Sequence, residues 1–271
     1  MAEVAPIFAT MLRQWRAHRR LSQLELAGLS GVSQRHLSFL ETGRANPSRG
    51  MVLALADALE VPLRDRNHLL QSAGFSAAFK EAPFEEDGMS AFNAALQQIL
   101  SQQEPYPALV LDGLWNLKFA NPSALRFFGL FVDPLAGLAA IGSPTEFQMV
   151  RLCLHEEGLK PYIVNWQELI ASFLSRARRA LLTNPRHDKL PVLIDEILNH
   201  PDAPQDWRTV WSANTDPAVP MVLRKENDTY RLFTMLAHFG AAQDITLEET
   251  SVELFYPADE FTRRRLEQLA R

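Results

Sequence analysis

A row of helix-boundary signals in the first 75 residues constrains the fold more than any other feature of the sequence. Ser22 followed by Glu25 has the spacing of a capping box, which opens a helix. Gly31 lies near the end of that helix, and Ser33 then opens another helix that stops at Gly43. Three further helices are expected over about residues 6–19, 48–59 and 62–74. The sequence therefore predicts an all-α domain of five short helices over residues 1–75.

The second and third of these helices fit a helix-turn-helix, in which the second helix presents polar side chains to the major groove of DNA. Leu37 and Leu40 form the apolar face of that helix and leave its other face free to meet DNA. We expect Arg35 to read guanine, Gln34 to read adenine and Phe39 to contact a thymine methyl group. Ser22 and Gln23 begin the preceding helix, where phosphate is favoured. The predicted contacts to double-stranded DNA are Ser22, Gln23, Ser33, Gln34, Arg35, Ser38 and Phe39.

Charge is distributed unevenly along the chain. The net charge is -5, but residues 1–80 carry ten Lys or Arg and six Asp or Glu, a local charge of +4. The remaining residues carry -9. A basic first domain is therefore joined to an acidic second part, and the positive field that DNA binding needs is local.

The segment LSQLELAGLSGVSQRHLSFLETGRANPS resembles the lambda-repressor-like (XRE) helix-turn-helix family, and the resemblance covers residues 6–74. It implies that Arg16 pairs with Glu41 inside the domain and that Arg44 touches a backbone phosphate. It also implies a bacterial transcription regulator that binds an inverted-repeat operator as a homodimer. The alternative is that Arg35 and Arg44 are only solvated surface charges.

After a linker predicted at residues 76–88, the pattern becomes mixed. One β-hairpin is expected around Gly113 and another around Asn227 and Asp228, with a fifth strand within residues 245–257. Helices are expected at about 90–102, 121–129, 145–156, 165–183 and 189–199. These elements predict an α+β domain over residues 89–271, with an antiparallel sheet packed on helices.

Aromatic and apolar residues are concentrated in this second domain. The run FFGLFVDPLAGLAAIG at residues 127–142 is too short to span a bilayer and is interpreted as core or pocket wall. One face of the sheet can wall a ligand cavity, although each aromatic residue taken singly is more often core. The aromatic candidates for ligand contact are Trp115, Phe119, Phe127, Phe128, Phe131, Phe147, Trp166 and Phe173.

The segments ALVLDGLWNLKFAN, LHEEGLKPYIVNW and DITLEETSVELFYPAD resemble the ligand-binding domain of MmyB-like transcription regulators, whose fold is similar to PAS domains. The resemblance implies sensing of a small apolar molecule, with a fatty acid or related acyl compound favoured. A fatty acid needs polar groups near its carboxylate. Arg151, His155, Asn165 and Arg178 are candidates by residue type, with surface salt bridging or helix capping as the alternative.

The sequence gives no support for an enzyme or for a bound cofactor other than a fatty acid ligand. His155-Glu156-Glu157 begins like a zinc-protease motif but lacks the second histidine, so no metal site is expected. Cys153 cannot form an internal disulfide and is interpreted as a buried, inert thiol. We expect a cytoplasmic chain without membrane insertion. Two alternatives remain open: a second domain that only dimerises or contacts another protein, and an enzyme fused to a DNA-binding domain.

Overall fold

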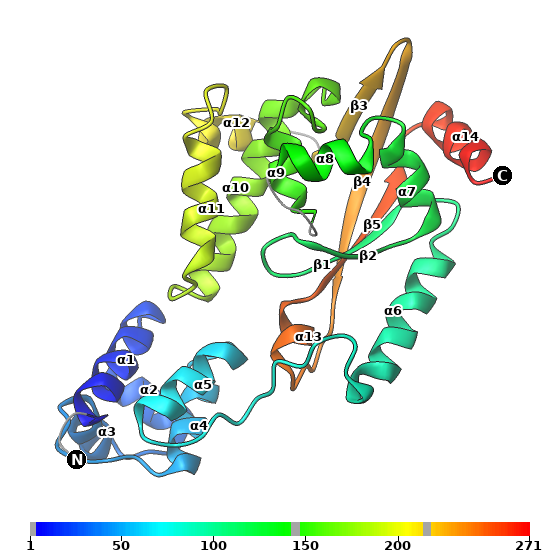
Figure 1. The fold of residues 1–271 in the computed structure, drawn as a ribbon. Coiled ribbons are helices and arrows are strands. Elements are labelled where there is room, and N and C mark those ends of the chain that lie inside the picture. The colour runs from blue at the N-terminus through cyan, green and yellow to red at the C-terminus, as the bar shows by residue number, and fades with distance from the viewer. Residues whose placement is uncertain (1–3, 142–146, 214–217) are drawn as a thin grey trace. The chain divides into compact units, whose positions relative to one another are not determined.

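The computed structural model describes residues 4–141, 147–213 and 218–271, and the chain divides into two compact units (Figure 1). The first unit comprises the chain up to Glu81 together with Ala180–Arg186 and Ala242–Glu248. The second comprises Ala82–Arg179, His187–Ala241 and Glu249–Arg271. The division after Glu81 falls within the segment predicted as a linker.

Five helices at the start of the first unit match the five that the sequence predicts. They are α1 (Val4–His18), α2 (Gln23–Ser30), α3 (Gln34–Glu41), α4 (Arg49–Ala58) and α5 (Leu63–Ser72). The capping box before α2 is complete, because Ser22 accepts from the Glu25 backbone and the Glu25 side chain accepts from the Ser22 backbone. Gly31 ends α2 in the left-handed conformation with φ 71°, which sets the turn into α3.

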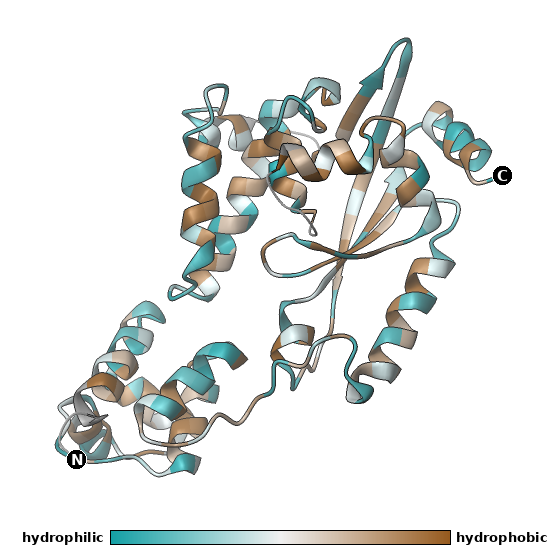
Figure 2. Cartoon of the chain, viewed as in Figure 1, coloured by the Kyte–Doolittle hydropathy of each residue, from teal (hydrophilic) through white to brown (hydrophobic). Residues whose placement is uncertain are grey.

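A single hydrophobic core joins these helices. Trp15 from α1, Leu26 from α2 and Leu37 from α3 are all essentially fully buried in it. In Figure 2 these helices carry both brown, hydrophobic residues and teal, hydrophilic residues, as expected of helices with one buried face. Burying each such side chain contributes roughly 1.5–3 kcal/mol, so packing rather than helix propensity holds these short helices.

The second unit is built on a five-stranded antiparallel sheet with the order β2-β1-β5-β4-β3. Its strands are β1 (Ala108–Leu111), β2 (Leu117–Ala120), β3 (Met221–Lys225), β4 (Asp228–His238) and β5 (Ser251–Pro257). The two predicted hairpins are present, and β5 lies between them and joins them into one sheet. The predicted fifth strand is wrong in its first half, because Ile245–Glu249 form the short helix α13.

Nine further helices are described after α5, of which α13 lies largely within the first unit. They are α6 (Ser90–Gln102), α7 (Pro122–Gly129), α8 (Pro134–Ala140), α9 (Met149–Leu154), α10 (Trp166–Thr183), α11 (Lys189–Leu198), α12 (Trp207–Ala213), α13 and α14 (Glu260–Leu269), with 3-10 turns at Asp87–Met89 and Lys160–Tyr162. The sequence did not predict α8, α12 and α14. The helix predicted over 145–156 is shorter than expected, and residues 145–146 lie outside the described residues. Within the described ranges, no helix is both long and apolar enough to cross a membrane.

Candidate DNA interface and ligand cavity

The recognition helix α3 exposes the face that the sequence assigned to DNA. Leu37 and Leu40 are fully buried, whereas Gln34 and Arg35 are exposed and Phe39 is half-buried. The guanidinium carbon of Arg35 lies 5.6 Å from the centroid of the Phe39 ring. This contact is a cation–π interaction, which holds the long Arg35 side chain over α3. Phe39 therefore packs beneath Arg35.

Glu41, the last residue of α3, is tied to α1. Arg16 donates to both of its carboxylate oxygens, over 2.6 and 2.8 Å, which confirms the pairing implied by the family resemblance. The Gln23 amide also donates to Glu41 over 2.8 Å. Burial disfavours the charge of Glu41, but the hydrogen bonds from Arg16 and Gln23 outweigh it, and the pKa of Glu41 lies below its usual value. Gln23, expected at a phosphate, thus has a structural contact inside the domain.

The remaining predicted DNA contacts lie at the N-caps of α2 and α3, within α3 and in the loop after it. Ser22 and Ser33 are exposed N-caps, and their side-chain oxygens accept backbone N–H groups of α2 and α3. Ser38 is half-buried in α3. Arg44 is exposed in the loop after α3, where its backbone N–H donates to Phe39 over 2.8 Å. Because the hydroxyls of Ser22 and Ser33 can still donate, capping and phosphate contact are compatible.

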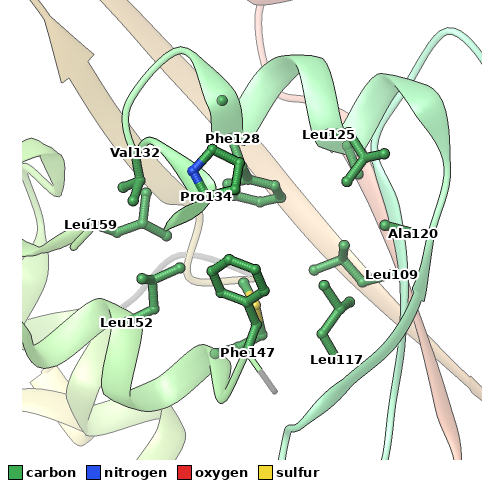
Figure 3. Close-up of a pocket in the computed structure, with 13 residues that line it drawn as sticks. Leu109, Leu117, Ala120, Leu125, Phe128, Val132, Pro134, Phe147, Leu152 and Leu159 are labelled. Atoms are coloured by element: carbon green, nitrogen blue, oxygen red, sulfur yellow. The ribbon is translucent and has the colours of Figure 1, made fainter. Parts of the chain in front are cut away.

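An apolar cavity of about 100 Å³ lies in the second unit between the sheet and its helices. Figure 3 shows side chains from β1, β2, α7 and α9 converging on it. Leu125, one of the lining residues, is 63% exposed, so one side of the cavity reaches the surface. The lining residues are Leu109, Leu117, Ala120, Ala124, Leu125, Phe128, Gly129, Val132, Pro134, Phe147, Met149, Leu152 and Leu159. All of them are nonpolar.

Of the predicted aromatic contacts, Phe128 and Phe147 line this cavity. Phe127 and Phe131 pack instead on Tyr230, with ring centroids 5.5 and 5.8 Å apart. Phe119 packs on Phe84 at 5.2 Å, and because Phe119 pairs with Val110, it points away from the face that carries Leu109. Trp115 packs on Phe173, and the Trp166 indole donates to the Cys153 carbonyl over 2.7 Å.

The predicted polar contacts lie outside the apolar cavity. Arg151 donates to both carboxylate oxygens of Glu196 over 2.9 and 3.0 Å, and Arg151 and His155 line a separate depression of about 450 Å³. Asn165 holds β3, because its amide donates to Pro220 and accepts from the Val222 backbone. Arg178 is exposed on α10.

Most of the lining is aliphatic, and these residues carry no sequence pattern that marks them as ligand contacts. Leu109 and Leu117 are typical strand residues, and only their register shows that they share a face with Ala120. One signal was available, since Phe128, Val132 and Pro134 lie in the apolar run at residues 127–142 that was interpreted as core or pocket wall.

Within the described parts of the chain, no cluster of three or more His, Cys, Asp or Glu side chains is placed to hold a metal ion. Cys153 is fully buried, and burial, together with the nearby charge of Glu253, raises the pKa of its thiol to about 12. A thiol with this pKa is a poor nucleophile at neutral pH.

A helix-turn-helix domain joined to a PAS-like α+β domain with an apolar cavity defines a DNA-binding transcription regulator with a ligand-binding C-terminal domain. The family model of the MmyB-like transcription regulator ligand binding domain matches residues 92–269, and a helix-turn-helix domain model matches residues 7–69. The chain therefore belongs to the MmyB-like transcription regulators.

Other comparisons are remote. No curated protein matches this sequence. One solved structure, described as that of an RNA-binding light-oxygen-voltage receptor, is similar to 98% of this chain at 12% identity and a TM-score of 0.25. This chain covers 62% of that receptor's chain.

Proposed function

We propose that the protein binds an inverted-repeat operator as a homodimer, and that a small acyl compound, with a fatty acid favoured, binds in its C-terminal domain and changes operator affinity. The observation that supports ligand binding is the wholly nonpolar lining of the cavity. An apolar lining favours a hydrocarbon chain, because each buried CH₂ contributes about 0.8 kcal/mol of transfer free energy.

The size of the cavity bears on how such a ligand enters. A volume of about 100 Å³ is small beside the roughly 300–1,000 Å³ of ordinary ligand pockets. A long acyl chain therefore requires the walls to move apart. Leu109 on β1 forms part of the cavity wall, and α6, the helix after the linker, packs against β1. A movement of β1 would therefore also move α6. We expect the ligand to act on the DNA-binding domain through α6 and this linker.

Binding to DNA is tested by a gel-shift series on the full chain. Arg35→Ala should relax sequence preference, because its proposed contact is to guanine, with a loss of about 1–3 kcal/mol at that base. Arg44→Ala should weaken all sequences alike and lower the salt dependence, because its proposed contact is to phosphate. Arg264→Ala, at an exposed arginine on α14, is the matched control. Unchanged binding by both test variants would contradict the proposed interface.

The ligand is tested by native mass spectrometry and lipid extraction of the purified protein, followed by a binding panel of saturated fatty acids of increasing chain length. We expect micromolar or tighter binding for some chain length. Absence of binding across the panel would reject the acyl ligand and favour a C-terminal domain that serves only dimerisation or protein contact.

A further inference from the structure

A partly buried ion pair joins α10 to the middle strand of the sheet. Arg176 donates to a carboxylate oxygen of Glu253 over 2.7 Å, and their side chains are only 21% and 8% exposed. The Arg176 guanidinium also lies over the rings of Trp115, at 5.5 Å, and Phe173, at 5.9 Å. Arg176 is thus held by one carboxylate and two aromatic rings, with part of its side chain reaching the surface.

This arrangement is costly for the fold. An ion pair that is partly withdrawn from water loses hydration at both ions, and apolar residues of similar volume often stabilise a protein as well or better. Trp115 also has φ 60°, a left-handed conformation that is strained for a residue other than glycine. Such costs gather where a protein binds a ligand, which makes this cluster a candidate for binding rather than for stability.

Two residues of the cluster contact residues that line the apolar cavity. Glu253 pairs in register with Leu109, a lining residue, and residues paired in this way have Cβ atoms about 4.5–5.5 Å apart on the same face. Trp115 accepts the backbone N–H of Met149, another lining residue, over 3.0 Å. The charged pair is therefore the next layer behind the cavity wall.

An acyl carboxylate in this cavity requires a cationic partner, and the described lining supplies none. Arg151 lines the separate depression with Glu196, and Arg178 is exposed. We propose that Arg176 binds the carboxylate of the ligand, with Glu253 holding the guanidinium in place until the ligand arrives. A guanidinium presents five N–H donors in a planar fork, which suits a second carboxylate. This inference rests on the proposed acyl-binding function and names the part of the site that recognises an acid.

The test compares dodecanoic acid with dodecan-1-ol, which have the same hydrocarbon chain and differ in charge, by calorimetry on the full chain. In the native protein we expect the acid to bind at least tenfold more tightly than the alcohol. Arg176→Gln should remove that preference and change alcohol binding less than threefold. Arg264→Gln, on exposed α14, should leave both affinities unchanged.

A second variant covers the case in which Arg176→Gln fails to fold, since it leaves Glu253 buried and unpaired. The double variant Arg176→Leu/Glu253→Leu replaces the pair with apolar side chains and should also bind acid and alcohol equally. If either folded variant keeps the preference for acid, or if Arg178→Gln loses it instead, Arg176 is not the partner of the carboxylate. Failure of the native protein to bind either probe would overturn both this inference and the proposed acyl ligand, whereas equal binding of both would overturn this inference alone.

Discussion

Arg16 and Glu41 form a two-pronged ion pair between α1 and the last residue of the recognition helix, with N···O distances of 2.6 and 2.8 Å. The Glu41 side chain is 3% exposed and that of Arg16 is 18% exposed. Because two N–H groups of the Arg16 guanidinium bind the two carboxylate oxygens, the pair fixes the orientation of α3 relative to α1. The orientation of the face proposed to read DNA thus depends on a contact at the C-terminal end of the helix.

Replacing Glu41 by Gln should destabilise the first domain by about 3 kcal/mol at pH 7, because Arg16 is left without its charged partner. The pKa of Glu41 is lowered in the folded state, so its stabilisation is fully present above its ordinary pKa of 4.5 and is lost as the pH falls through the lower, folded value. Urea unfolding of the two proteins should therefore show a difference that shrinks between pH 6 and pH 3. A difference that stays constant over that range would contradict the role of the Glu41 charge.

Gly28 and Gly31 provide a matched pair for testing the turn between α2 and α3. At both positions an added Cβ meets nothing within 4 Å, but Gly31 has φ 71° and Gly28 does not have a positive φ. Gly31→Ala should cost about 1 kcal/mol, since an L-residue is strained there, whereas Gly28→Ala should stabilise α2 by about 0.5–1 kcal/mol. Thermal unfolding distinguishes the two, and equal effects would mean that backbone conformation does not set this turn.

Cys153 should resist alkylation in the folded protein. Its pKa of about 12 leaves almost no thiolate at pH 8, and its side chain is fully buried. Iodoacetamide at pH 8 should label the thiol only after unfolding in urea, as followed by intact-mass spectrometry. Rapid labelling of the native protein would show that the second domain is more open than described.

Filling the apolar cavity should block the ligand without unfolding the domain. Ala120 is a half-buried lining residue, and Ala120→Phe should weaken acyl binding at least tenfold by occupying the cavity. Ala136, exposed on α8 and absent from the lining, gives the control Ala136→Phe. The free energy of unfolding of both variants should lie within about 1 kcal/mol of that of the native protein. Equal ligand affinity in the two variants would place the binding site elsewhere.

The first domain was predictable because its signals are local. Ser22, Ser33 and Ser48 each cap the helix that follows, and these patterns can be read from a few neighbouring residues. The two hairpins were found for the same reason. Helix α14 was missed because it carries two buried residues, Thr262 and Leu266, among many charges, which gives little apolar pattern.

The cavity was harder to predict because it depends on pairing between distant strands. The register of β1 with β2 and β5 decides whether Leu109 or Val110 faces the cavity. That register cannot be predicted from the sequence of one strand alone. Aromatic residue type alone was a poor guide to ligand contact, because Phe127 and Phe131 pack on Tyr230 and do not line the cavity. The pairing of Arg176 with Glu253, 77 positions apart, left no local signal.

The most direct test of a ligand-responsive regulator is operator affinity with and without the ligand. An operator is first selected from a random DNA pool with the full chain, and its Kd is then measured at one salt concentration with and without saturating dodecanoic acid. We predict a change of at least fivefold in the native protein and none in Ala120→Phe, because a ligand shifts a two-state equilibrium only through differential affinity. An unchanged Kd despite confirmed ligand binding would mean that the ligand is structural and does not regulate DNA binding.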